Sequence, residues 1–145
     1  MRAALAGIIY ALVVFAAGIV VTLIRLGFLQ PEIGPTFASI MELPVILALS
    51  WFVSQEVINF QRLGGDVIAR IAMGVVGFIL LILCEFLLAN VLFQKSPGMY
   101  VASLLVWPGV LGFIGEIVFA VIPILQHAAR RRPVSPGFGL GRKPL

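Results

Sequence analysis

Four glutamates stand in or beside long apolar stretches of this chain, where an acidic side chain is least expected. They are Glu42, Glu56, Glu85 and Glu116. An ionisable group near the centre of a membrane helix costs about 2.5–3.5 kcal/mol on insertion scales, so it normally faces the protein interior and marks a site. The chemistry that such residues offer is the transfer of a proton or a cation between buried carboxyl groups.

The rise along a helix sorts the charged residues of these stretches by depth. The outer group is Arg25, Glu42 and Glu85, and the inner group is Glu56, Arg70 and Glu116. In one interpretation the glutamates form a proton or cation pathway, with Glu85 and Glu116 at different depths. In the other they form ion pairs that fix helix register. The outer pair would join Arg25 to Glu42 or Glu85, and the inner pair would join Arg70 to Glu56 or Glu116. A matching arginine at each level favours the ion pairs.

Other residue types that catalyse reactions or bind metals are scarce. The single cysteine, Cys84, lies in an apolar run and is interpreted as a packing residue. The single histidine, His127, has no cysteine beside it and is interpreted as an interfacial cation. The serines of the apolar stretches have no histidine near them, so no activated nucleophile is indicated. We therefore expect no enzyme activity, no cofactor and no metal site.

The composition is that of an integral membrane protein. Apolar residues make up 61% of the 145 residues and charged residues only 11%, with a mean hydropathy of +1.16. A soluble domain carries about 25% charged residues. The apolar runs are continuous rather than alternating, which predicts helices and excludes a transmembrane barrel.

These runs predict an all-α fold, a membrane bundle of four spanning helices. The spans cover residues 3–24, roughly 36–58, 71–93 and 100–125. The first run is longer than the 7–15 apolar residues of a signal peptide, so we interpret it as a retained span. Non-helical connections are predicted at 26–35, where prolines and Gly34 break the helix, at 59–66, with Asp66 capping the next helix, and at 94–99.

The second span has two interpretations, because Pro44 lies inside it. Proline lacks the N–H that the carbonyl of Ile40 would accept from. Either one continuous helix is kinked at Pro44, or a surface helix ends near Glu42 and the span begins at Pro44 as a first-turn residue. The continuous, kinked helix is favoured.

Small residues recur at helical spacing on two of the spans. Ala3, Gly7 and Ala11 form such a stripe on the first span. On the fourth, the shared face holds Gly109, Gly112, Glu116, Ala120 and Pro123. Small residues let neighbouring helices approach closely, so both faces should look into a bundle.

Basic residues are distributed unequally between the two sides of the membrane. With four spans, eight of the ten fall on the side that holds both termini, and only Arg25 and Lys95 fall on the other. The positive-inside rule therefore places both termini in the cytoplasm. Residues 1–128 form the membrane domain, and residues 129–145 form a basic, flexible tail. The arginines that follow the last span, Arg130, Arg131 and Arg132, are expected to contact anionic lipid headgroups. No pattern typical of nucleic-acid binding is present.

One segment carries a family resemblance. Residues 22–47, TLIRLGFLQPEIGPTFASIMELPVIL, include Thr22, Arg25, Gly34, Glu42 and Pro44. This pattern resembles a group of small uncharacterised four-helix proteins of the bacterial inner membrane. The resemblance implies a multi-pass inner-membrane location and brings no activity or ligand.

Two functions are consistent with these features. The first is a non-enzymatic accessory, scaffold or assembly subunit that packs against a membrane protein partner or a second copy of itself. It is favoured because packing surface is abundant and no catalytic constellation is present. The second is a small proton-coupled transporter or channel that uses the intramembrane glutamates.

Overall fold

The computed structural model describes residues 1–63 and 65–130. Its elements are α1 (Arg2–Ile24), the π-helical turn η1 (Arg25–Leu29), α2 (Gln30–Phe60), α3 (Val67–Phe93), α4 (Pro97–Leu104) and α5 (Gly109–Arg130). The all-α prediction is therefore confirmed for the described part of the chain. The first two residues of the predicted tail, 129–145, are helical, because α5 continues to Arg130. Residues 131–145 lie outside the described residues.

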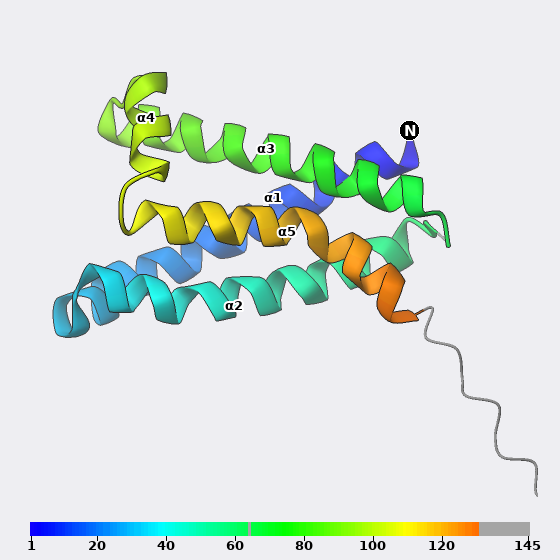
Figure 1. Ribbon diagram of the computed structural model, residues 1–145, viewed down its shortest axis with the longest axis horizontal. Helices are drawn as coiled ribbons and strands as arrows, with labels where there is room; N and C mark the ends of the chain where they lie inside the picture. Colours follow the sequence, from blue (N-terminus) through cyan, green and yellow to red (C-terminus); the bar gives the residue numbers. More distant parts are fainter. Residues whose placement is uncertain (64, 131–145) are drawn as a thin grey trace, which may run out of the picture.

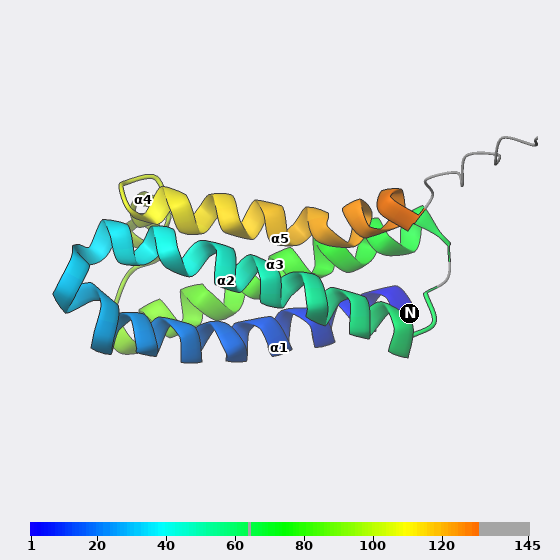
Figure 2. The same cartoon turned by 90° about the horizontal axis from the view of Figure 1, so that it is seen from below.

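The four long helices, α1, α2, α3 and α5, lie side by side as a bundle (Figures 1 and 2). The N-terminus, the α2–α3 connection and the end of α5 lie at one end, which we call the terminal end. The turn η1 and the short helix α4 lie at the opposite end, which we call the η1–α4 end.

Within the described residues, three helical segments are long and apolar enough to cross a membrane: Arg2–Phe60, Val67–Phe93 and Gly109–Ala129. The first has 59 residues and contains α1, η1 and α2, which fold back on each other as a hairpin (Figure 2). Segments of this length and composition indicate a membrane protein.

The predicted non-helical connection at 26–35 is wrong in its extent. Helical structure runs through η1 into α2, and the one non-helical residue inside α2 is Gly34, with φ 80° and ψ 165°. Pro31 lies in the first turn of α2, where its missing N–H is not needed. Only the glycine takes the positive φ, because it has no Cβ to clash. The helix also continues through Pro44, so the interpretation in which a span begins at Pro44 is wrong.

The predicted fourth span at 100–125 is also wrong, because it is two helices. α4 ends at Leu104 and α5 begins at Gly109. Pro108 separates them, since proline has no N–H to donate and disfavours helical backbone in the residue before it. The predicted cap at Asp66 is confirmed. Its side chain accepts a hydrogen bond from the Ile68 N–H at 2.9 Å at the start of α3.

Glycines allow close contacts between helices, as the small-residue stripes predicted. A Cβ at Gly7 of α1 would lie 2.7 Å from the carbonyl oxygen of Met73 in α3. A Cβ at Gly74 would collide with the carbonyl of Ala120 in α5. These backbones are in contact, which brings α1, α3 and α5 together near the terminal end.

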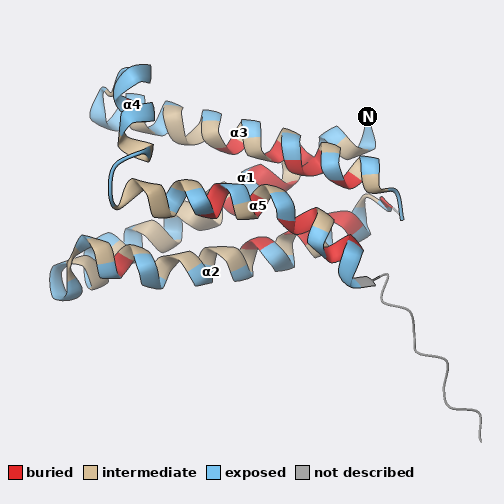
Figure 3. Ribbon diagram, viewed as in Figure 1, coloured by how far each residue is buried: buried red, intermediate tan, exposed pale blue. Residues whose placement is uncertain are grey.

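The buried core lies in this terminal half (red in Figure 3). Tyr10 of α1 stacks on Phe119 of α5 with ring centroids 4.1 Å apart and planes 7° from parallel. The Tyr10 hydroxyl donates to the Phe119 carbonyl at 3.1 Å. Pro123 leaves that carbonyl without its helical donor, so Tyr10 replaces the missing hydrogen bond.

Candidate functional site

The half of the bundle nearer the η1–α4 end is hollow. It contains a cavity of about 560 Å³ between α1, α2, α3 and α5. The lining of α1 starts at Val14 and that of α3 at Leu81, so the cavity begins where the core ends. Its walls are mainly apolar and include Phe15, Ile19, Leu88 and Phe119.

Two carboxyl groups face each other in this cavity. Glu85 of α3 and Glu116 of α5 both line it and interact with each other, and Tyr100 of α4 interacts with both. Glu116 is 6% exposed and Tyr100 is 7% exposed. Glu116 Oε2 and the Tyr100 hydroxyl are buried and lack a hydrogen-bond partner among the described residues. Within that part of the chain, neither glutamate has an arginine or lysine at ion-pair distance.

The prediction that Glu85 and Glu116 lie at different depths is wrong. It counted the helical rise from Tyr100, whereas the last long helix begins at Gly109. Counted from there, Glu116 is about 10 Å along α5, and Glu85 is about 12 Å from the end of α3 at Phe93. Both carboxyls therefore lie at a similar distance from the η1–α4 end.

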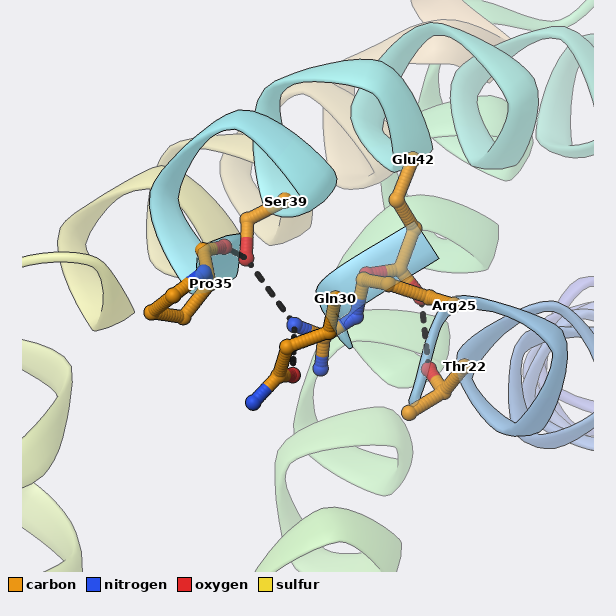
Figure 4. A network of polar contacts seen from close by, with 6 residues as sticks. All are labelled: Thr22, Arg25, Gln30, Pro35, Ser39 and Glu42. Carbon is orange, nitrogen blue, oxygen red and sulfur yellow. Dashed lines mark hydrogen bonds and ion pairs between the residues drawn. The ribbon is translucent and has the colours of Figure 1, made fainter. Parts of the chain in front are cut away.

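A second polar cluster joins the α1–α2 hairpin at the same end (Figure 4). Arg25 Nε lies 2.7 Å from Glu42 Oε2, which is one of the two outer ion pairs that the sequence predicts. Thr22 donates to Glu42 Oε1 at 2.6 Å, and Arg25 Nη1 donates to Ser39 Oγ at 3.1 Å. Arg25 also reaches Gln30, and Ser39 donates to the carbonyl of Pro35 at 2.9 Å.

This cluster neutralises the third acid of the cavity wall. Both carboxylate oxygens of Glu42 are engaged, one by Arg25 and one by Thr22. Its charge is therefore balanced within the hairpin. The negative charge available to a ligand in the cavity comes from Glu85 and Glu116.

The other predicted site residues lie elsewhere. Glu56 is exposed on α2 and is not part of the cavity lining. Arg70 is 2% exposed near the start of α3, and its Nη1 donates to the carbonyl of Pro123 at 3.4 Å. Neither residue lines the cavity, so the inner group predicted around Glu116 does not form there. The predicted headgroup contacts cannot be located, because the side chain of Arg130 and the residues Arg131 and Arg132 lie outside what the structure describes.

The terminal half holds polar residues of its own, and two of them, Ser54 and Gln126, are hydrogen-bonded. Ser54 donates to Gln126 Oε1 at 2.9 Å, and Gln126 Nε2 donates to the Trp51 carbonyl at 2.7 Å. His127 is 8% exposed, so its side chain is buried against the neighbouring helices. These contacts join α2 to α5 and explain why polar groups are tolerated in the core.

Tyr100 was not identified from the sequence as a member of the site. It packs edge-on against Phe86, with centroids 5.6 Å apart. Its contact with the carboxyls depends on the separation of α4 from α5. The Pro108–Gly109 pair was the signal for that break, because this dipeptide punctuates helices.

Comparison with known proteins identifies no relative: no protein-family model, curated protein or solved structure matches this chain. Among the described residues there is also no group of three or more His, Cys, Asp or Glu side chains that could hold a metal ion. The candidate site is therefore defined by its own geometry, an apolar cavity with a carboxyl pair and a tyrosine hydroxyl.

Proposed function

We propose that this chain is a small multi-pass protein of the bacterial inner membrane with four crossing helices and both termini in the cytoplasm. The 23 residues of α1 and the 31 of α2 are each long enough to cross, since a span needs about 20. The hairpin between them supports counting Arg2–Phe60 as two crossings.

Charge supports the orientation. The terminal end carries Arg2, Arg62 and Arg70, whereas the η1–α4 end carries Arg25 and Lys95 together with Glu32. The basic residues of the C-terminal sequence add to the terminal side, where Arg130–132 would meet anionic headgroups. In this orientation the η1–α4 end, and the cavity beside it, face away from the cytoplasm.

The function that this geometry supports best is that of a small proton-coupled transporter or channel. The observation that carries it is the Glu85–Glu116 pair, which lines a cavity and has no cationic partner in the described residues. Two carboxyls held together away from water repel each other as anions, so such a pair takes up a proton or a cation. Ion pairs that only fix helix register would instead bring each acid to an arginine.

The positions of the glycines also favour a transporter or channel over an accessory subunit. The sequence favoured an accessory subunit because its small-residue faces offered packing surface. Gly7 and Gly74 are occupied by contacts within the chain, and Gly115 lies against Leu43 of α2. Gly18 and Gly112 line the cavity. Gly7, Gly74 and Gly115 are therefore used for packing inside the bundle.

An accessory or assembly subunit is the second candidate, favoured by one feature. Helix α4 and the turn after it expose large apolar side chains, namely Met99, Val101, Leu105, Val106 and Trp107. A membrane protein partner or a second copy would cover that surface. In this case the carboxyl pair would be dispensable to the partner's function.

The test is proton movement in vesicles. Purified protein is reconstituted into liposomes that contain a pH-sensitive dye, and proton flux is measured under an imposed potential. Glu85→Gln and Glu116→Gln should each lower the flux by about tenfold or more, because the proton-binding group is lost. Glu56→Gln, outside the cavity, is the matched control and should leave it unchanged. Wild-type vesicles no more permeable than protein-free vesicles would contradict the proposal.

A further inference from the structure

The cavity is better suited to an organic cation than to a hydrated metal ion. Hard cations such as Ca²⁺ take about six to eight oxygen ligands. Here the oxygens of Glu42 are engaged, and Ser39 is bonded to Arg25 and Pro35. The oxygens left are those of Glu85, Glu116 and Tyr100. That set is too small to replace the hydration shell of such an ion.

The size and lining of the cavity fit a ligand larger than a metal ion. Its volume of about 560 Å³ lies within the range of about 300–1,000 Å³ that is typical of small-molecule sites. The rings of Phe15, Phe93 and Phe119 line it. Apolar and aromatic walls favour a guest that is itself apolar, and aromatic faces attract cations.

The carboxyl groups of the cavity determine which sign of charge a bound ligand should carry. Glu42 is neutralised by Arg25, so the charge balance of the cavity is set by the Glu85–Glu116 pair. Glu116 Oε2 and the Tyr100 hydroxyl are buried and unpartnered in the described residues, and both belong to cavity-lining side chains. A buried polar atom without a partner is costly, and a bound cation would relieve that cost.

The cavity extends to the η1–α4 end. The cavity lining extends along α1 to Leu26 and along α3 to Phe93, which are residues of the η1–α4 end. Towards the terminal end it stops at the stacked rings of Tyr10 and Phe119 and the core beneath them. A guest therefore enters from the side of η1 and α4.

We propose that this cavity binds a monovalent lipophilic cation, with the Glu85–Glu116 pair as its counter-charge and entry from the η1–α4 end. This inference rests on the proposed transport function and names its substrate class. The cation takes the place of a proton on the carboxyl pair, which is the exchange that a proton-coupled carrier requires.

The test measures binding of radiolabelled tetraphenylphosphonium to the purified full-length protein by equilibrium dialysis in mild detergent. Binding should be saturable, and neutral triphenylphosphine oxide should compete weakly. Glu116→Gln and Glu85→Gln should each weaken binding by about tenfold or more, because each removes half of the counter-charge. The control Glu56→Gln should bind as the wild type does.

A second pair of variants tests the cavity without touching a charge. Gly112→Leu and Gly18→Leu add side chains at two cavity-lining positions where a Cβ meets nothing within 4 Å, so the first added carbon touches no neighbouring helix. Each should weaken binding while the helical circular dichroism spectrum and the elution volume stay those of the wild type.

The possible outcomes separate this site from the proposed function. No saturable binding to the folded wild-type protein would overturn the lipophilic-cation site, and proton flux that depends on Glu85 and Glu116 would still support transport. Equal binding of the neutral analogue would overturn the role of the carboxyl pair. Binding that depends on the pair, in a protein that moves no protons, would support the site and contradict the transport function.

Discussion

The two halves of the bundle are built from the same residue types but differ in how tightly the helices pack. In the terminal half, Gly7 and Gly74 press helix backbones together, and Tyr10 stacks on Phe119. In the other half the helices surround a cavity of about 560 Å³. The difference indicates that the terminal half stabilises the fold and that the other half has room for a ligand.

Two pairs of buried polar residues, one in each half, also differ in their hydrogen bonds. Ser54 and Gln126 in the packed half are fully buried, and their hydrogen bonds are made. Glu116 and Tyr100 in the hollow half are also buried, but each has an atom with no partner among the described residues. Native structures pair nearly all buried polar atoms, and a bound cation would account for the two atoms of Glu116 and Tyr100.

The largest expected effect comes from adding one methyl group to the packed half. Gly74→Ala places a Cβ against the Ala120 carbonyl, so α3 and α5 must move apart. We expect a loss of about 3 kcal/mol or more of unfolding free energy, the upper range for overpacking. Thermal unfolding of the purified protein in detergent measures it.

The matched control is the same substitution in the hollow half. Gly18 of α1 has nothing within 4 Å of a built Cβ, so Gly18→Ala should be neutral or stabilising by up to about 1 kcal/mol. Equal destabilisation by the two substitutions would show that the halves are packed alike and would remove the contrast.

A smaller effect is expected at the hairpin. Glu42→Leu removes the acceptor of Arg25 and Thr22, which leaves a partly buried guanidinium without its carboxylate. We expect a loss of about 2 kcal/mol, because the pair is not fully buried and water can reach Arg25. Chemical denaturation followed by tryptophan fluorescence measures it, with Glu42→Gln as the milder variant. A neutral result for Glu42→Leu would show that this cluster does not hold α1 to α2.

The smallest effect is expected at Tyr10, which stacks on the cavity-lining residue Phe119. Tyr10→Phe keeps the ring stacked on Phe119 but removes the hydroxyl that bonds its carbonyl. A loss of about 1 kcal/mol is expected, since the carbonyl that Pro123 leaves free has no other donor in the helix. The unfolding midpoint in detergent measures the change. Unchanged stability would mean that the hydrogen bond contributes nothing to the packed half.

Much of the fold followed from local properties of the sequence. The apolar runs predicted the long helices, and Asp66 was correctly identified as a cap. The stripe containing Gly7 correctly indicated a close helix contact. The errors were at proline and glycine positions. Gly34 reverses the chain inside a helical segment, and Pro108 divides the predicted last span.

Glu85 and Glu116 were named as candidate site residues from the sequence, but their contact with each other and with Tyr100 was not predicted. Helical periodicity shows which face a residue occupies, and it correctly placed Glu116 inside the bundle. It does not show which helix faces that side. The predicted partners of Glu116 were Arg70 and the inner group, whereas its neighbours are Glu85 and Tyr100.

The sequence by itself determined that the chain is helical, that its helices are apolar enough for a membrane, and that its basic residues are distributed unequally along the chain. These properties are sums over neighbouring residues, so they need no knowledge of the fold. Only the tertiary structure decided that Glu85 meets Glu116 beside an open cavity. That contact depends on where α5 begins and on which backbones the glycines allow to touch, and both are set by packing between distant segments.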